Sequence, residues 1–151
     1  MNNVQYGVYS NICFHSSQSL TTGDSDRDAP KHIVFLSQLL LLFKICILCK
    51  ADNPLIITRQ KGSMVVVKAT CSNLSCGHEN IWSSQPYWKN TKIPSGNLLL
   101  SMAILFAGSS ISKVSTIFKH MGLGCMSLST FFKIQRVCTT FESILCVLNC
   151  V

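Results

Sequence analysis

Acidic residues are few in this sequence, and they are unevenly distributed. Of six carboxylates, three lie within residues 24–28 and only three follow residue 30. Phosphoryl transfer on two metal ions requires several carboxylates around the ions, and three widely separated acids are a poor source of them. The sequence also lacks an activated serine or cysteine arrangement, and its four histidines are far apart in the chain. We therefore expect a protein that is not an enzyme and has no small-molecule substrate.

The beginning of the chain lacks the pattern of a secretory leader. The first ten residues, MNNVQYGVYS, contain no charged region followed by an apolar one. The nine cysteines form an odd set without the regular spacing of a disulfide-stapled secreted domain. These absences favour a reducing compartment, with the nucleus expected and the cytoplasm as the alternative. Residues 1–30 are polar and rich in Ser, Thr and Asp, so we expect them to form a disordered tail.

A long uninterrupted apolar run is also missing. The segment from Ile33 to Cys49 is apolar, but Ser37, Gln38 and Lys44 interrupt it. A membrane-spanning helix needs roughly 20 predominantly apolar residues. A short buried helix is therefore the preferred interpretation of this segment, and a membrane contact is the less favoured alternative.

Positive charge, by contrast, is abundant. Between Lys31 and Arg136 the sequence holds twelve Lys or Arg residues and only two acids. A surface with this bias attracts polyanions, and nucleic acid and anionic membranes are the usual ones.

Cysteines in the middle of the chain have the spacing of metal ligands. Two residues separate Cys46 from Cys49, and a second group contains Cys71, Cys76 and His78. A C-x2-C turn presents two thiolates to one ion, and a second such turn completes the tetrahedral site of a structural Zn²⁺. Because four residues separate Cys71 from Cys76, His78 competes with either of them as a ligand. The alternative is that these are buried free cysteines, which pack as small hydrophobes.

Three strands are expected around these residues. The segments LIITRQ and KGSMVVVKATC predict a hairpin joined at Lys61-Gly62, and HENIWSSQP predicts a third strand. A small sheet held by metal at one end is the arrangement of a zinc ribbon. Trp82 and Trp88 are expected to cover this sheet, with stacking on bases as the less favoured alternative.

A helical period begins at Asn97. It predicts three helices, the first ending at Gly108, the second at about His120, and the third beginning after a serine N-cap. Gly122 and Gly124 lie in the short turn before the third helix. Three helices with such a turn match a helix-turn-helix, whose last helix enters the major groove of DNA.

The predicted fold class is therefore α+β, a zinc-ribbon-like unit followed by a three-helix unit that resembles a helix-turn-helix. The predicted parts are a disordered tail over 1–30, a short helix and ribbon over 31–88, the helical unit over 89–137 and an aberrant apolar tail over 138–151.

One face of the third helix is expected to contact DNA. Four apolar side chains should turn inward, namely Leu128, Phe131, Phe132 and Ile134. The predicted DNA contacts lie opposite them and on the second helix, namely Ser129, Thr130, Lys133, Arg136, Lys113 and Lys119. Cations contact phosphates or guanine edges, and threonine reaches bases or backbone. A plain helical bundle with a solvated basic face is the alternative.

Two strings resemble a family of uncharacterised animal proteins derived from DNA transposons. They are W-x-SQP from Trp82 to Pro86 and PSGNLLLSMAILFAG from Pro94 to Gly108, within a similarity that covers Lys31 to Arg136. The resemblance implies that Cys46, Cys49, Cys71 and Cys76 are paired zinc-binding cysteines. Fuller members continue into a segment similar to a transposase catalytic domain. This chain departs after Arg136, because VCTTFESILCVLNCV lacks the expected Tyr-Leu-x-Pro continuation.

Together these patterns predict a non-catalytic, zinc-stabilised DNA-binding fragment of a transposase-like protein. Its expected partner is double-stranded DNA, and a homo-oligomer is left open. The alternative function is a non-catalytic protein-interaction or membrane-associated protein that uses the apolar segments. Steep loss of binding with rising salt would indicate phosphate contacts and would distinguish the two functions.

Overall fold

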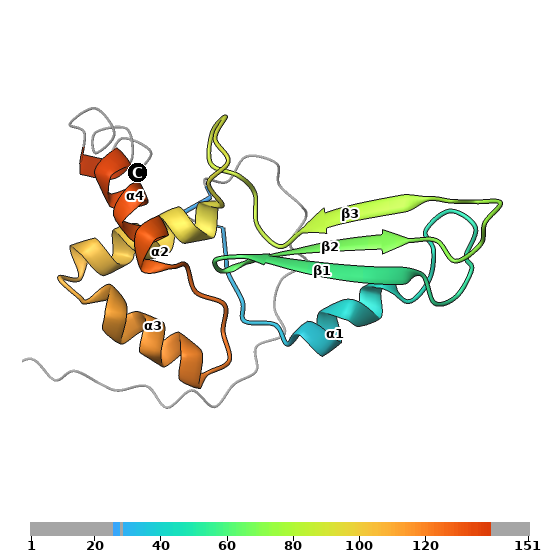
Figure 1. Cartoon of the computed structure of the whole chain (residues 1–151), viewed down its shortest axis with the longest axis horizontal. Helices are drawn as coiled ribbons and strands as arrows, with labels where there is room; N and C mark the ends of the chain where they lie inside the picture. The colour runs from blue at the N-terminus through green and yellow to red at the C-terminus, as the bar shows by residue number, and fades with distance from the viewer. Residues whose placement is uncertain (1–25, 28, 140–151) are drawn as a thin grey trace, which may run out of the picture.

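The computed structural model describes residues 26, 27 and 29–139, which form a small sheet and a helical unit at one end of it (Figure 1). The elements in chain order are α1 (Leu36–Leu40), the 3-10 turn η1 (Leu41–Phe43), β1 (Leu55–Lys61), β2 (Met64–Thr70), β3 (Glu79–Ser83), α2 (Ser95–Phe106), α3 (Ile111–His120) and α4 (Leu128–Thr139). This arrangement confirms the predicted α+β class.

The three strands form an antiparallel sheet in the order β1-β2-β3. Lys61 pairs with Met64, so Gly62 and Ser63 alone form the hairpin turn. Gly62 has a φ of 66°, and a glycine at the first central position is typical of a type II′ turn. The predicted hairpin and third strand are confirmed, with the turn one residue later than expected.

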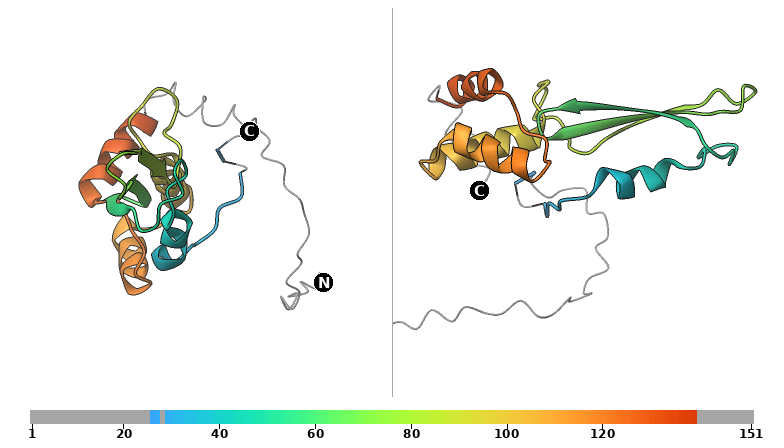
Figure 2. Two further views of the ribbon diagram at one scale, coloured as in Figure 1. Left: turned by 90° about the vertical axis from the view of Figure 1, so that its right-hand side faces the viewer. Right: turned by 60° about the horizontal axis from the view of Figure 1, so that its bottom comes forward.

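The segment before the sheet packs on one face of it. Figure 2 shows α1 and η1 running beneath the strands. Phe43 of η1 forms a buried cluster with Val67 and Ala69 of β2. The Phe43 ring also meets the ring of Trp82 edge to face, with centroids 6.0 Å apart. Trp82 therefore helps to cover the sheet, as predicted.

Most apolar side chains between residues 33 and 48 remain exposed, so the expected short buried helix is wrong. Phe35 is 78% exposed and Leu42 is 76% exposed. The reason is geometric, because α1 has only five residues and the small sheet covers one side of it. No helix in the described part of the chain is long and apolar enough to cross a bilayer.

The last three helices share a second apolar core. Its buried members are Leu98, Met102, Ile104, Ile111, Met126, Phe131 and Ile134. Trp88 packs against this core, and not on the sheet as predicted. Its backbone N–H donates to the Ile93 carbonyl at 2.9 Å, which folds the connecting loop back toward the helices.

Only two of the four apolar residues expected to turn inward on α4 do so. Phe131 and Ile134 are buried, whereas Leu128 is 48% exposed and Phe132 is 50% exposed. The two buried residues lie three positions apart and form one narrow stripe. Phe132 lies beside this stripe, with its ring 5.5 Å from that of Phe131, and Leu128 is the first residue of the helix. The prediction for Leu128 and Phe132 is therefore wrong.

The helix ends follow local sequence signals. The Ser127 hydroxyl accepts a hydrogen bond from the Thr130 N–H at 3.2 Å, which confirms the predicted N-cap of α4. At the end of α3, Gly122 has a φ of 68°, and the Leu123 N–H donates to the Phe118 carbonyl at 2.8 Å in a Schellman motif. The connection from α3 to α4 covers 121–127, which is longer than the three- or four-residue turn of a helix-turn-helix.

A buried amide joins the hairpin turn to α2. Asn97 is 2% exposed, and its Oδ1 accepts hydrogen bonds from the N–H and the hydroxyl of Ser63, each at 2.8 Å. Its Nδ2 donates to the Lys61 carbonyl at 3.1 Å. A side chain at Gly62 would collide with this amide. Asn97 therefore requires glycine at the turn and satisfies polar groups on both sides of it.

Gln85 binds the same turn from the segment after β3. Its Nε2 donates to the Ser63 hydroxyl at 3.0 Å, and its Oε1 accepts a hydrogen bond from the Gly96 N–H at 3.1 Å. The strings W-x-SQP and PSGN thus meet at the hairpin turn, because Gln85 comes from one and Asn97 from the other. We call this network of Gln85, Asn97, Lys61 and Ser63 the polar clasp.

The predicted tails lie largely outside the described residues. Residues 1–25 and 28 are not described, so the disorder expected over 1–30 is untested there. Asp26 is described, and its carboxylate accepts a hydrogen bond from the Ser95 hydroxyl at 2.5 Å. Helix α4 continues to Thr139, past the expected boundary at 137, and residues 140–151 lie outside the description.

Replacing Asn97 with alanine should lower the free energy of unfolding by about 2–4 kcal/mol, because three partly buried polar groups of Lys61 and Ser63 lose a hydrogen-bond partner. Urea denaturation followed by circular dichroism measures this loss. The matched control is Gln38→Ala, at an exposed position of α1, which should change stability by about 0.5 kcal/mol or less. Equal effects of the two substitutions would contradict a role for the clasp.

Candidate metal centre and basic surface

The first pair of cysteines lies on a tight turn after η1. The Cys46 N–H donates to the Ala51 carbonyl at 2.8 Å, and the Lys50 N–H donates to the Cys46 carbonyl at 3.1 Å. Lys50, directly after Cys49, adopts a left-handed conformation with a φ of 60°. We call residues 46–51 the first knuckle.

The second pair lies on a turn that closes in the same way, residues 71–78, which we call the second knuckle. The Cys71 N–H donates to the His78 carbonyl at 2.8 Å, and Gly77, directly after Cys76, has a φ of 55°. In both knuckles the first cysteine N–H therefore bonds to the second residue after the second cysteine. The two additional residues of the second knuckle are accommodated by Asn73, whose Oδ1 accepts a hydrogen bond from the Ser75 N–H at 3.0 Å.

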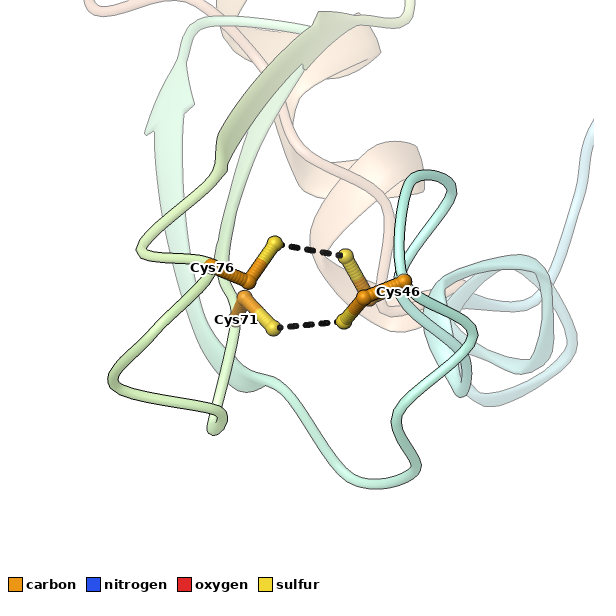
Figure 3. A group of neighbouring side chains, drawn as sticks. Cys46, Cys71 and Cys76 are labelled. Atoms are coloured by element: carbon orange, nitrogen blue, oxygen red, sulfur yellow. Dashed lines mark hydrogen bonds between the residues drawn. The ribbon is translucent and has the colours of Figure 1, made fainter.

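The two knuckles lie at the end of the sheet remote from the helical unit (Figure 1), and their four sulphur atoms converge there (Figure 3). All four Sγ atoms lie within 4.8 Å of one another. Between the knuckles, Cys46 Sγ lies 4.0 Å from Cys76 Sγ, and Cys49 Sγ lies 3.4 Å from Cys71 Sγ. Ligand sulphurs of a tetrahedral Zn²⁺ site, with Zn–S bonds of about 2.3 Å, are about 3.8 Å apart. The cluster is thus of the right size and chemistry to hold a metal ion.

The surroundings of the sulphurs favour different protonation states at different cysteines. Hydrogen bonds from the backbone of Cys49 and Leu48 lower the pKa of Cys46 to about 6. Burial raises the pKa of Cys71 to about 12, and this effect exceeds the opposing hydrogen bond from the Asn73 N–H. Four thiolates this close repel one another, so full ionisation of the cluster requires a cation among them.

His78 contributes its backbone, and its imidazole is not in the group of side chains that could hold a metal ion. That group consists of the four cysteines, while the His78 carbonyl closes the second knuckle. The His78 Nε2 is buried without a hydrogen-bond partner in the described part of the chain. His78 lines a cavity of about 20 Å³ together with Cys46 and Cys71, which is enough space for one water molecule.

The residues predicted to contact DNA lie on two helices and do not form one continuous set. Five are exposed, namely Lys113 and Lys119 on α3 and Ser129, Lys133 and Arg136 on α4. Thr130 is half-buried, and its hydroxyl lies 2.9 Å from that of Ser127. Thr130 and Lys133 line a groove of about 680 Å³ beside the hairpin turn, which the other four residues do not line.

The sequence interpretation missed the opposite wall of that groove. Lys61 at the end of β1 and Lys92 in the loop before α2 contribute to the lining. Because Lys61 and Lys92 are far from α4 in the sequence, no local pattern predicted that they lie close to this helix. The closure of the second knuckle was also missed, although Gly77 directly after Cys76 was a usable indication of a left-handed residue at that position.

Substitutions at the second knuckle should identify the fourth ligand. We expect Cys76→Ser to lose stoichiometric metal, because a tetrahedral site loses one of four thiolates. We expect His78→Ala to keep one ion per chain, because the backbone carbonyl that closes the knuckle is retained. Elemental analysis of chains purified after zinc loading measures both stoichiometries. Metal loss in the His78 variant with retention in the Cys76 variant would reverse the ligand assignment.

Metal affinity should fall as pH falls. In the metal-free cluster at neutral pH, Cys46 is largely a thiolate and Cys71 holds a proton, so metal binding must displace at least one proton. Between pH 8 and 6 the apparent affinity should therefore decrease by at least about tenfold per pH unit. Chelator competition at pH 6, 7 and 8, corrected for the chelator's own protonation, measures this change. An affinity that does not vary with pH would exclude thiol ligands with displaceable protons.

Comparisons with protein-family models, with curated proteins and with solved structures found no match to this chain. Its functional interpretation therefore depends on the geometry and the charge of its own residues.

Proposed function

We propose that this protein is a zinc-stabilised, non-catalytic DNA-binding protein that uses its helical unit to contact duplex DNA. The observation that carries this proposal is the charge of residues 89–137, which contain six Lys or Arg residues and no Asp or Glu. All six cations are exposed, namely Lys89, Lys92, Lys113, Lys119, Lys133 and Arg136. A surface with this excess of positive charge attracts a polyanion, and the phosphate backbone of DNA is the most common one.

Zinc is the metal that best suits the cysteine cluster. Thiolate ligands in tetrahedral arrangement select Zn²⁺ or an iron–sulphur centre, and a single group of four sulphurs on two knuckles is typical of structural zinc. A site with four protein ligands leaves no open position for a substrate, which accords with a structural role. In this proposal Zn²⁺ supports the sheet, and the helical unit binds DNA.

The resemblance to transposon-derived proteins leads to a proposal about the origin of the chain. A DNA-binding part of a transposase-like protein would combine a cysteine-based zinc site with a helical reading unit, and its place of action would be the nucleus. Helix α4 is the candidate reading helix, because it carries Lys133 and Arg136 at an exposed surface. The long connection before α4 makes this unit a variant of the helix-turn-helix and not a standard member.

A second function is favoured by the exposed apolar surface between residues 33 and 48. Phe35, Leu42 and Leu48 are each at least 65% exposed, and contiguous apolar surface of this kind marks interaction sites. A protein-interaction role would use this surface, with a second copy of the chain as the simplest partner. Such apolar association would persist at high salt, whereas phosphate binding would weaken.

The double substitution Lys133→Ala and Arg136→Ala should weaken binding of a duplex by about 1–3 kcal/mol, because two cations on α4 no longer contact DNA. It should also lower the slope of log affinity against log salt by about 2. Fluorescence anisotropy with a labelled duplex over a salt series measures both quantities, after circular dichroism has confirmed the fold.

The matched control is Lys44→Ala with Lys68→Ala, which removes the same charge from the sheet unit, outside the two knuckles and the helical unit. This control should change the salt slope by much less than 2. An unchanged slope in the α4 variant, or equal changes in both variants, would show that α4 is not the contacting helix.

A further inference from the structure

The groove beside the hairpin turn has two walls from distant parts of the chain. Gly62 and Lys61 of the hairpin and Lys92 form one wall, and α4 forms the other. Its volume is about 680 Å³, which lies within the range of sites that hold a small organic ligand. The space is therefore larger than a single phosphate or metal ion would need.

The charged residues among those described in the groove have one sign. Lys61, Lys92 and Lys133 line it, and none of the described lining residues is acidic. The Lys61 ammonium donates to the Lys92 carbonyl at 2.5 Å and lies 5.1 Å from the centre of the Tyr87 ring, so its position is fixed from both sides. Several ammonium groups around one space repel one another and favour an anion between them. Phosphate is an anion that accepts from lysine as a point charge.

The remaining lining is apolar or carries neutral hydrogen-bonding groups. Ile93, Met126 and Ile134 provide an apolar floor, and Gln60 and Ser127 provide an amide and a hydroxyl. On α4 the contributing positions are 130, 133, 134 and 137, which lie on one helix face because they are spaced by three, four and seven residues. A flat ring with polar edges matches this floor, and lysines around it match an attached phosphate.

We propose that this groove binds a nucleotide, with its phosphate at Lys61, Lys92 and Lys133 and its base on the apolar floor. The nucleotide is either a free mononucleotide or the phosphorylated end of an unpaired nucleic-acid strand, since both present the same chemistry. This inference goes beyond the proposed function, and the two have Lys133 in common. Nucleotide binding in the groove does not require that α4 reads duplex DNA.

The test uses the full zinc-loaded chain, observed by ¹H–¹⁵N correlation spectra. The probes are thymidine 5′-monophosphate, thymidine, a 5′-phosphorylated pentathymidylate and a blunt duplex. Thymidine 5′-monophosphate should shift the amide signals of Gly62, Ser127 and Thr130, and thymidine should bind at least about tenfold more weakly, because it lacks the charged contact. Similar affinities for the mononucleotide and the pentamer would identify a free nucleotide as the ligand, and much tighter binding of the pentamer would identify a strand end.

The variant is Lys92→Gln, and the control is Lys44→Gln, which makes the same charge change at an exposed position outside the groove. Lys92→Gln should lower nucleotide affinity by about tenfold, and Lys44→Gln by less than about twofold. Equal binding of thymidine and its monophosphate, equal effects of the two variants, or shifts confined to residues outside the groove would each overturn the inference. Duplex binding together with no groove shifts on addition of thymidine 5′-monophosphate or the pentamer would sink this inference alone. Nucleotide binding in the groove without any duplex binding would sink the proposed function alone.

Discussion

The convergence of four cysteine sulphurs at one end of the sheet is the constraint on which the sheet unit depends. Among the described residues, the buried cluster on the sheet consists of Phe43, Val67 and Ala69. A core this small does not stabilise a three-stranded sheet alone, and natural domains of this size add a metal or disulfides. The two knuckles close by equivalent backbone hydrogen bonds, so both present their sulphurs toward the same point. A bound ion would convert this convergence into a fixed end of the hairpin.

The other end of the hairpin is fixed by polar groups. Asn97 and Gln85 surround Ser63 with hydrogen bonds of 2.8–3.0 Å, and directional bonds of this kind set orientation more strictly than apolar contact does. The polar clasp therefore holds the hairpin turn in a defined position relative to α2. Because the same turn forms one wall of the groove, the geometry of the groove depends on the clasp. Lys61 of the hairpin, Lys92 and Lys133 of α4 consequently line the same groove.

The sequence predicted those features that depend on neighbouring residues. Gly62 marked the hairpin turn, Ser127 marked the start of α4, and the cysteine spacing marked the knuckles. Contacts between distant residues were not predictable in this way. Asn97 was interpreted as the first residue of an apolar helix, although its partners Ser63 and Lys61 lie 34 and 36 positions earlier. Likewise, the helical period predicts that Phe132 turns inward, but it does not indicate whether a neighbouring element covers this side chain.

The cysteine cluster and the acid-free helical unit support one account, in which a structural zinc ion stabilises a protein with a cationic surface for nucleic acid. X-ray absorption at the zinc edge, on the full chain purified without added metal, tests this account most directly. The account predicts one zinc ion per chain with four sulphur ligands at about 2.3 Å. A folded chain without zinc, or a ligand shell that contains nitrogen, would contradict it.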